Sequence, residues 1–512
     1  MALHTNLSYE GYGWAEFGDP LIRVGGPTVV SVNERGSTVA EMKVIEIPTA
    51  VSMQDGVSDL FRDTMTSFNR TVSCKLTVTC ANGVFTSVDQ TFRGANLNLQ
   101  EATASMEFHC YRGSYVESES APTYWRLPIL NFHGELRPPL RSAELEHVMR
   151  LSQENPASPF KMFGMPGFIE YIPGYKEILE SQKDGDRNPQ ITAVMFGATG
   201  GHNSGWNNLQ DWFPFDFLNL IGFASGVRVG APWIEFSDEK GRLISRIHVQ
   251  LGTTLIQRGH AFMDDVIHNG GLGRLLTCAA KSPEFRKTYF RVAMNHLLLG
   301  VRNSQTLEDK ISHLSRALEG LAAEFGFSHQ FLLEAAEDEV KVRVKRELRS
   351  ASAGILKIAL EQEILGRADV AACLRKIAER AISNPANIDR DFGLSVSSLL
   401  DCLGLRDAEV VEAYYQATPR TDGRKWHQVL SRYRGLTQHG EAFRFKDGEH
   451  SVNEVFRLAS HLADIVARIL LIQLRYDGDY QRATGTWRDA NTTSWVTPTT
   501  SAVELGYRRD EG

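Results

Sequence analysis

The stretch 307-LEDKISHLSRALEGL-321 decides the fold of the second half of this 512-residue chain. Its apolar residues recur every three or four positions, at Ile311, Leu314, Leu318 and Leu321, and Phe325 continues the series. An α-helix turns once in 3.6 residues, so this spacing places all five on one helical face. The helical period begins at about residue 279, and an all-helical second half is predicted.

Further helices are predicted across several later segments, namely 331–365, 368–382, 395–403 and 407–416. Ser383-Asn-Pro385 separates two of them, because proline cannot continue a helix. The final helix has a defined start at Ser451-Val-Asn-Glu454, a capping box in which Ser451 is the N-cap and Glu454 reaches back to it. This helix is expected to run to about Tyr476.

The first half has the two-residue period of β-strands. Lys75–Cys80 alternates apolar and polar residues, and Ala81-Asn-Gly83 provides a turn before Val84. Val39–Ile47 alternates in the same way and stops at Pro48. A hairpin is predicted from Trp233–Phe236 to Leu243–Val249, around the polar loop that ends at Gly241.

These patterns predict an α+β multidomain protein with a strand-rich N-terminal region followed by an all-α bundle. The expected domains are residues 1–272, as one region or two subdomains, residues 273–480, and a polar tail over residues 481–512. At this length more than one hydrophobic core is the normal expectation.

Charge, hydropathy and cysteine spacing argue against several classes of protein. The formal net charge is −7, which argues against sequence-blind binding of nucleic acid through overall positive charge. The apolar stretch Ile465–Leu474 is interrupted by Arg468 and Gln473 and is far shorter than the roughly 20 residues of a membrane span. The N-terminus does not resemble a signal peptide, and the six cysteines lack paired spacing. A cytoplasmic protein without a membrane partner is expected.

Several motifs for metal or cofactor chemistry are not met. Gly197-Ala-Thr-Gly-Gly201 follows a predicted strand, but His202 and Asn203 stand where a phosphate-binding loop needs Gly-Lys. No Cys-x-x-Cys occurs, and His109-Cys110 has no partner at zinc spacing. The chain also lacks a Gly-x-Ser-x-Gly elbow. No metal and no cofactor are therefore expected.

The segment 425-KWHQVLSRYRGLTQHGEAF-443 carries the strongest functional signal. Arg434 is followed after five positions by His439, and the context includes Tyr433, Gly440 and the capped final helix. A spacing of four to six residues between an arginine and the following histidine is not specific by itself. It also fits Arg126/His133, Arg141/His147, Arg242/His248, Arg291/His296, Arg420/His427, Arg432/His439 and Arg444/His450.

This segment resembles the signature of HEPN domains, the higher eukaryote and prokaryote nucleotide-binding superfamily. Upstream, Ala317-Leu-Glu-Gly-Leu321 resembles the Ala-Leu-Glu-x-Leu core of ApeA-like HEPN proteins, with Glu319 as its glutamate. The resemblance covers roughly residues 278–480, and the first half is only loosely similar to the N-terminal regions of those proteins. It implies a metal-independent endoribonuclease in which Arg434 and His439 are catalytic.

RNA supplies its own nucleophile, the 2′-hydroxyl, so residues of this kind suit its cleavage. Histidine can act as base or acid near neutral pH, and arginine can donate two hydrogen bonds to phosphate oxygens. On an ideal helix Arg434 and His439 lie about 140° apart. They converge only if the helix loosens at Gly435 or a second chain contributes, and the resemblance implies a twofold homodimer.

Three further residues are supporting candidates. Glu319 is a candidate to orient a site arginine, and Arg432 lies seven positions before His439. The family often has a polar residue after its arginine, where this chain has Gly435, so Gln438 is the candidate substitute.

Two function classes remain open. One is a ribonuclease acting as an anti-phage or toxin-like effector, whose first half senses a phage-derived or cellular trigger. The other is a non-catalytic module that binds RNA or nucleotide or scaffolds a partner.

Overall fold

The computed structural model describes most of the chain. The described residues are 7–17, 22–33, 37–46, 74–98, 103–134, 136, 156–162, 165–184, 188–199, 215–251, 256–263, 270–327, 330–332, 338–383, 387–389, 392–405, 426–438, 452–476, 478 and 480–483. Two compact units are present. The sheet unit comprises Met1–Thr306 with Ala467–Ser501, and the helical unit comprises Leu307–Val466 with Ala502–Gly512.

This organisation confirms an α+β fold with a large antiparallel sheet in the first half. The compact units divide at Thr306/Leu307, whereas the predicted domains divide at 272/273. The two helices between these positions belong to the sheet unit, because they pack against its strands and its other helix. Ser282 and Tyr289 also donate to Gln473, which lies in the part of the last helix that the same unit includes.

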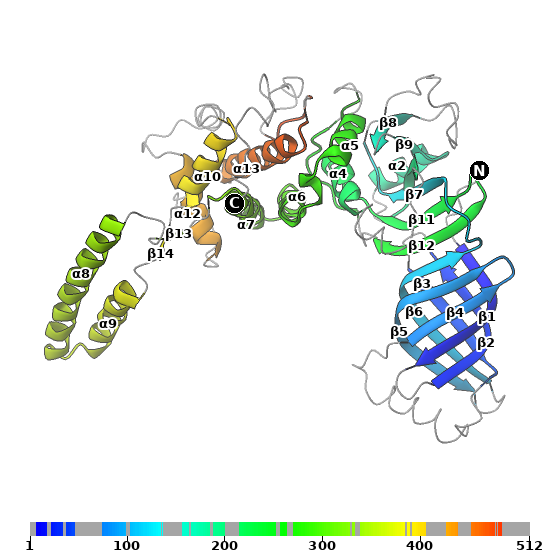
Figure 1. The fold of residues 1–512 in the computed structure, drawn as a ribbon, viewed down its shortest axis with the longest axis horizontal. Coiled ribbons are helices and arrows are strands. Elements are labelled where there is room, and N and C mark those ends of the chain that lie inside the picture. Colours follow the sequence, from blue (N-terminus) through cyan, green and yellow to red (C-terminus); the bar gives the residue numbers. More distant parts are fainter. Residues whose placement is uncertain are drawn as a thin grey trace. The chain divides into compact units, whose positions relative to one another are not determined.

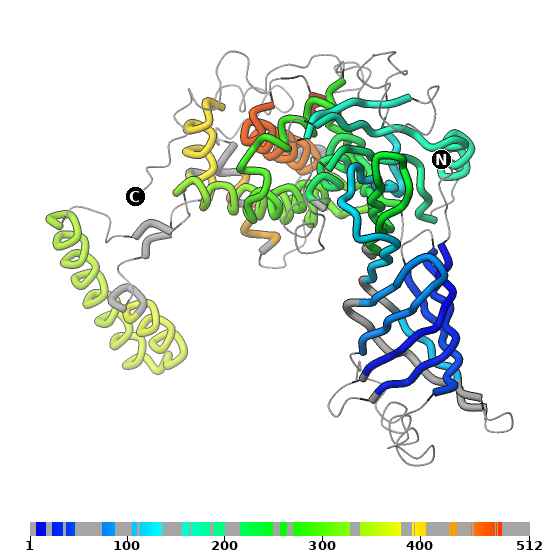
Figure 2. The backbone as a smooth tube through the Cα atoms, turned by 45° about the vertical axis from the view of Figure 1, so that its right-hand side comes forward, coloured from blue at the N-terminus to red at the C-terminus, as the bar shows by residue number. Residues whose placement is uncertain are grey.

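Six strands of the sheet unit close into a cylinder (Figures 1 and 2). They are β1 (Leu7–Phe17), β2 (Ile22–Val32), β3 (Thr38–Val44), β4 (Cys74–Cys80), β5 (Val84–Asn98) and β6 (Thr103–Val116). Their order is β3-β2-β1-β4-β5-β6, and β3 also pairs with β6, so the ring is complete. The predicted strand 75–80, its turn and the start of the next strand are confirmed.

Alternating burial explains why these sequences form a closed sheet. In β3 and β4 every second side chain points inward, and Ala40, Leu76 and Val78 are fully buried there. Phe85 and Phe108 fill the same core. Gly26 lies where a Cβ would overlap the main-chain oxygen of Lys43, so the curvature at this point requires glycine.

The sheet continues beyond the cylinder through β6. Along the edge of β6 that does not pair with β5, Ala104–Cys110 pair with β3 and Arg112–Val116 pair with β12. The continuing order is β12-β11-β7-β10-β9-β8. These strands are β7 (Tyr124–Leu130), β8 (Ala157–Met162), β9 (Met165–Tyr171), β10 (Ile191–Ala198), β11 (Ala231–Ser237) and β12 (Leu243–Leu251). The predicted hairpin 233–249 is confirmed as β11–β12.

Among the described residues, four α-helices before Thr306 accompany this open part of the sheet. They are α2 (Tyr175–Lys183), α4 (Phe215–Ser225), α5 (Gly271–Lys281) and α6 (Thr288–Gly300). Helix α5 packs on β8, and α4 packs on α5 and α6. Over the residues that the structure describes, no helix is both long and apolar enough to span a membrane.

The helical unit begins with the stretch quoted first in the sequence analysis. Its elements are α7 (Leu307–Glu324), β13 (Gln330–Leu332), α8 (Asp338–Ile364), α9 (Ala368–Ser383), β14 (Asn387–Asp389), α10 (Phe392–Cys402), α12 (Trp426–Gln438) and α13 (Val452–Gln473), which runs on into the sheet unit at Ala467. Leu314, Leu318 and Leu321 are fully buried, as their spacing predicted.

One predicted helix starts later than expected. Residues 330–332 form a strand that pairs with β14, and α8 begins only at Asp338. Phe331 and Ile388 are partners in this two-stranded antiparallel ladder. The predicted helix over 407–416 and the cap residue Ser451 lie outside the described residues, and α13 begins at Val452.

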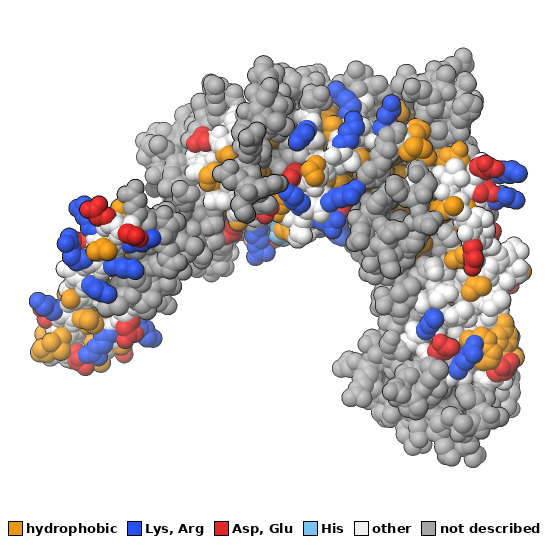
Figure 3. Space-filling model, in the orientation of Figure 1, with side chains coloured by type: hydrophobic (Ala, Val, Ile, Leu, Met, Phe, Trp, Pro, Cys, Tyr) orange, Lys and Arg blue, Asp and Glu red, His pale blue; other side chains and the backbone are white. Residues whose placement is uncertain are grey.

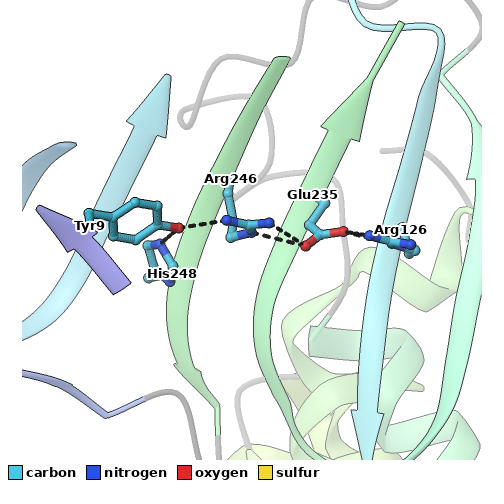
Figure 4. Close-up of polar contacts among 5 residues, drawn as sticks. All are labelled: Tyr9, Arg126, Glu235, Arg246 and His248. Atoms are coloured by element: carbon cyan, nitrogen blue, oxygen red, sulfur yellow. Dashed lines mark hydrogen bonds and ion pairs between the residues drawn. The ribbon is translucent and has the colours of Figure 1, made fainter. Parts of the chain in front are cut away.

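A chain of polar side chains crosses the sheet unit where the cylinder joins the open sheet (Figure 4). Glu235 on β11 receives hydrogen bonds from Arg126 on β7 and from Arg246 on β12, the latter at 2.9 and 2.8 Å. Arg246 Nη1 also donates to Tyr9 Oη at 2.8 Å, and Tyr9 Oη lies 2.9 Å from His248 Nε2. The chain therefore connects β1 of the cylinder with three strands of the open sheet.

The charge states follow from these contacts. Burial alone would raise the pKa of the Glu235 carboxyl, but Arg126 and Arg246 hold it below its ordinary value. Burial, with a contribution from Arg246, lowers the pKa of His248 to about 3. Tyr9 Oη accepts from Arg246 Nη1 and lies within hydrogen-bonding distance of Nε2 of the neutral His248 imidazole.

Removing the shared negative charge should destabilise the sheet unit. Glu235→Gln leaves two buried guanidinium groups without a counter-ion, which typically costs about 3–5 kcal/mol. Arg242→Gln is the control, because its ion pair with Asp238 has an arginine side chain that is 75% exposed and should contribute less than about 1 kcal/mol. Urea unfolding followed by tryptophan fluorescence measures both. Equal stability of the two variants would contradict the buried chain.

The buried imidazole also predicts acid sensitivity. The folded pKa of His248 is about 3, below the ordinary 6.5, so its stabilising contribution is complete above pH 6.5 and is lost as the pH falls toward 3. The loss reaches up to about 1.4 kcal/mol per pH unit. His133, whose pKa burial and Arg258 lower to about 4, adds a similar loss. His248→Gln should therefore reduce the slope of unfolding free energy against pH between 6.5 and 4.5, and an unchanged slope would exclude this role.

Candidate functional site

The candidate site lies on three packed helices of the helical unit, α7, α10 and α12. Leu318 on α7, Leu399 on α10 and Leu430 on α12 are fully buried between them. Ser431 Oγ accepts a hydrogen bond from the Gly393 main-chain nitrogen at 3.1 Å, which ties α12 to the first turn of α10. The apolar packing and this cap fix the face of α12 that carries Arg434.

Arg434 is held by one carboxylate and one aromatic ring. Its Nη2 donates to Glu319 Oε1 on α7 at 2.9 Å, and its Cζ lies 4.6 Å from the centroid of the Phe392 ring on α10. The two charged side chains are 18% and 27% exposed, so the pair is partly shielded from water but reachable. Nε of Arg434 is buried and has no hydrogen-bond partner among the residues that the structure describes.

The structure thus brings together two of the five residues proposed for the site. Glu319 contacts Arg434, as its proposed orienting role requires. Arg432 and Gln438 lie on α12, but their side chains are outside the described set. His439 follows the last described residue of α12 and is also outside it. The geometry between Arg434 and His439 is therefore still a prediction.

Helix α12 does not loosen at Gly435. The helix is continuous from Trp426 to Gln438, and Gly435 lies inside it. A Cβ at Gly435 would have no heavy atom within 4 Å, so a larger side chain fits there without displacing its neighbours. The missing polar group at this position therefore reflects the residue type and not a steric demand of the fold.

Other arginines from the spacing-matched pairs also have carboxylate partners. In the sheet unit, Arg126 binds Glu235, Arg242 binds Asp238, and Arg291 binds Asp216 at 2.9 Å. Bare spacing consequently does not identify a site. Arg434 contacts a carboxylate and a ring face together, whereas its exposed fraction of 18% is close to the 14% of Arg126.

Sequence reasoning did not find Phe392, because no local pattern predicts a contact between α10 and α12. It also overlooked His461 and Asp464, which are 97% buried on the apolar helix α13. Their spacing of three places them on one helical face, and polar residues inside an apolar run were the available signal. Within the described ranges, no three His, Cys, Asp or Glu side chains gather closely enough to hold a metal ion.

The arrangement holds a permanently charged guanidinium group against one carboxylate and one ring. A guanidinium group has five N–H donors, and among the described residues Arg434 donates to Glu319 through Nη2. Guanidinium donors of this kind can bind the oxygens of a phosphate group. Glu319 offsets part of the positive charge of Arg434.

A double-mutant cycle should detect the Glu319–Arg434 pair. Glu319→Gln, Arg434→Gln and the double variant are expected to give a coupling free energy of about 1 kcal/mol, because both groups are partly buried. The matched control is Arg346–Glu347 on α8, whose side chains are 74% and 66% exposed and should show no measurable coupling. Chemical denaturation measures both cycles. Equal coupling in the two would remove the orienting role from Glu319.

Comparison with known proteins yields no relative of this chain. No protein-family model, no curated protein and no solved structure matches it.

Proposed function

We propose that the helical unit cleaves RNA without a metal, as a HEPN-type endoribonuclease with Arg434 and His439 as its catalytic residues. The observation that carries the proposal is the fixed position of Arg434 between Glu319 and Phe392. The sequence resemblance suggests the reaction, and the contacts that hold Arg434, the residue that the resemblance selects, support it.

In the proposed reaction the 2′-oxygen attacks the neighbouring phosphorus atom and the 5′-oxygen departs. His439 removes the 2′-proton or protonates the leaving 5′-oxygen, and positioned proton transfer typically accelerates a reaction by about 10²–10⁴-fold. Arg434 donates to the non-bridging oxygens as their charge develops. Glu319 positions the guanidinium group through its hydrogen bond. The products carry a 2′,3′-cyclic phosphate and a 5′-hydroxyl.

Two copies of the chain would divide the proton transfers. One imidazole cannot begin the reaction as both base and acid, whereas two symmetry-related His439 side chains can take one role each. We therefore propose a homodimeric cytoplasmic effector of the anti-phage or toxin-like kind. Its sheet unit would respond to a phage-derived or cellular trigger.

A non-catalytic RNA- or nucleotide-binding or scaffolding module is the second candidate. Gly435 favours it, because glycine cannot supply the hydrogen bond that family members place after the arginine. The open space at Gly435 makes this testable. Gly435→Asn should raise cleavage if the missing amide limits the enzyme, and should leave RNA binding alone unchanged.

The decisive assay is cleavage of total RNA and tRNA with EDTA present. His439→Ala should lower the cleavage rate at least about 100-fold, and Arg434→Ala should abolish phosphate stabilisation with a similar loss. His296→Ala is the matched control, since His296 follows Arg291 on α6 at the same spacing and should be dispensable.

Three outcomes separate the candidates. Cleavage by the wild type and the control alone, leaving cyclic phosphate ends, supports the enzyme. Cleavage that survives both site substitutions moves the reaction to another site. RNA retention without cleavage, lost on Arg434→Ala, favours the binding module.

A further inference from the structure

Three buried polar atoms that form no hydrogen bond lie close together in the sheet unit. They are Nε2 of His133, in the loop after β7, and Oε1 and Nε2 of Gln182, near the end of α2. Gln182 is only 4% exposed. Its amide lies beside the imidazole and opposes the lowering of the pKa of His133, but no hydrogen bond of normal geometry joins the two side chains.

Buried polar groups of this kind are uncommon in folded proteins. More than about nine in ten have a hydrogen-bond partner, and a buried group without one costs free energy of folding. Binding sites are where such groups are expected, because a few buried polar side chains there form their hydrogen bonds with a bound molecule. The Gln182 amide and the His133 imidazole therefore point to a ligand with polar atoms.

Two positively charged side chains stand beside this amide. Arg258 Nη2 lies 3.5 Å from the main-chain oxygen of Gln182, and Lys183 follows Gln182 in the chain. Burial is the largest cause that lowers the pKa of His133 to about 4, and both cations add to it. Among the described residues neither cation binds a carboxylate, and both residues are exposed, so their charge is available to a ligand from solvent.

Basic side chains elsewhere on this protein are often paired with acidic ones. On α8 and α9, which pack against each other, basic and acidic side chains lie side by side (Figure 3). Lys341 binds Asp338 at 3.0 Å there, and Arg375 binds Glu363. The uncompensated positive charge beside Gln182 is therefore a local feature of a chain whose net charge is −7.

The loop that carries His133 is fixed by its own hydrogen bonds. Asn131 has a left-handed conformation, with a φ of 62°, which residues other than glycine seldom adopt. Its Oδ1 accepts from Gln190 N at 3.2 Å, and Phe132 N donates to Thr192 Oγ1 at 2.8 Å. The imidazole is therefore in position before a ligand arrives, as in preorganised binding sites.

A phosphate monoester fits this set of groups best. The guanidinium and ammonium groups carry two positive charges, which match the charge of about −1.5 to −2 on a phosphate monoester better than the single charge of a carboxylate. The Gln182 amide and Arg258 can donate to its oxygens. Because the amide and the imidazole nitrogen are buried, a terminal phosphate group can reach them more readily than a phosphate inside a polynucleotide chain.

We propose that the sheet unit binds the terminal phosphate group of a small phosphate monoester. The site consists of His133, Gln182, Lys183 and Arg258. The two cations balance the charge of the phosphate, and the amide of Gln182 completes its hydrogen bonds on the phosphate oxygens. This inference goes beyond the proposed function, because it uses neither Arg434 nor RNA cleavage, and a binding measurement without RNA succeeds or fails separately from that reaction.

Calorimetric titration of the full-length chain with AMP, adenosine and inorganic phosphate tests the proposal. AMP should bind with a dissociation constant below about 1 mM and should compete with inorganic phosphate, whereas adenosine should bind at least about tenfold more weakly. Arg258→Gln with Lys183→Gln should raise the dissociation constant of AMP at least about tenfold, because charge-assisted hydrogen bonds are lost. Arg242→Gln is the matched control, since it removes an exposed cation of the same unit and should change the affinity less than about twofold.

A second variant, Gln182→Met, separates ligand binding from folding. Methionine is similar in length and lacks the polar amide, so the free protein should be at least as stable to urea as the wild type. The dissociation constant of AMP should nevertheless rise at least about fivefold, because the amide no longer donates to the phosphate. Lost stability with unchanged affinity would show that the amide has a structural role only, and would overturn the proposal.

Three further results would overturn it. One is equal affinity for AMP and adenosine, which would show that the phosphate is not recognised. Another is an equal loss of affinity in the Arg242→Gln control, which would show attraction by overall charge. The third is tighter binding of an oligonucleotide that lacks terminal phosphates than of AMP, lost in the Arg258 and Lys183 variant, which would assign the cations to a nucleic-acid backbone.

Discussion

The divided edge of β6 is the constraint on which the sheet unit depends. Along one edge β6 pairs with β5, and along the other it pairs first with β3 and then with β12. The first pairing closes the cylinder, and the second continues it into the open sheet. The cylinder and the open sheet therefore share the strand β6. Val194 and Trp233 of the open sheet belong to the same buried cluster as Phe85 of the cylinder.

Burying the polar chain at this junction costs free energy of folding, and the packing of the apolar cores must offset that cost. Glu235 is only 7% exposed, and two arginines converge on it. A buried ion pair is weak evidence for stability by itself, because desolvation consumes much of the attraction. Its clearer effect is on specificity. Tyr9 of β1 must meet Arg246 and His248 of β12, and a strand shifted by one residue would point these side chains to the opposite face.

Local patterns predicted most elements but not how they meet. Alternation in Lys75–Cys80 and the helical period of Ile311–Leu321 are local properties, so both could be predicted from neighbouring residues. The pairing of β3 with β6 joins segments that are distant in sequence, and the sequence of neither strand indicates which strand it pairs with. A signal was present at Glu235, since a carboxylate within the apolar run Trp233–Phe236 must find a cation when that strand is buried.

The same difference between local patterns and contacts between distant segments applies to the candidate site. A motif selected Arg434 and an upstream motif selected Glu319, and the structure places their side chains in contact. Phe392 was not predicted, because its ring reaches Arg434 only through the packing of α10 on α12.

The proposed reaction needs both a base and an acid, whereas each chain offers one His439. Because one imidazole cannot begin the reaction in both protonation states, the proposed chemistry itself calls for a second copy of the helical unit.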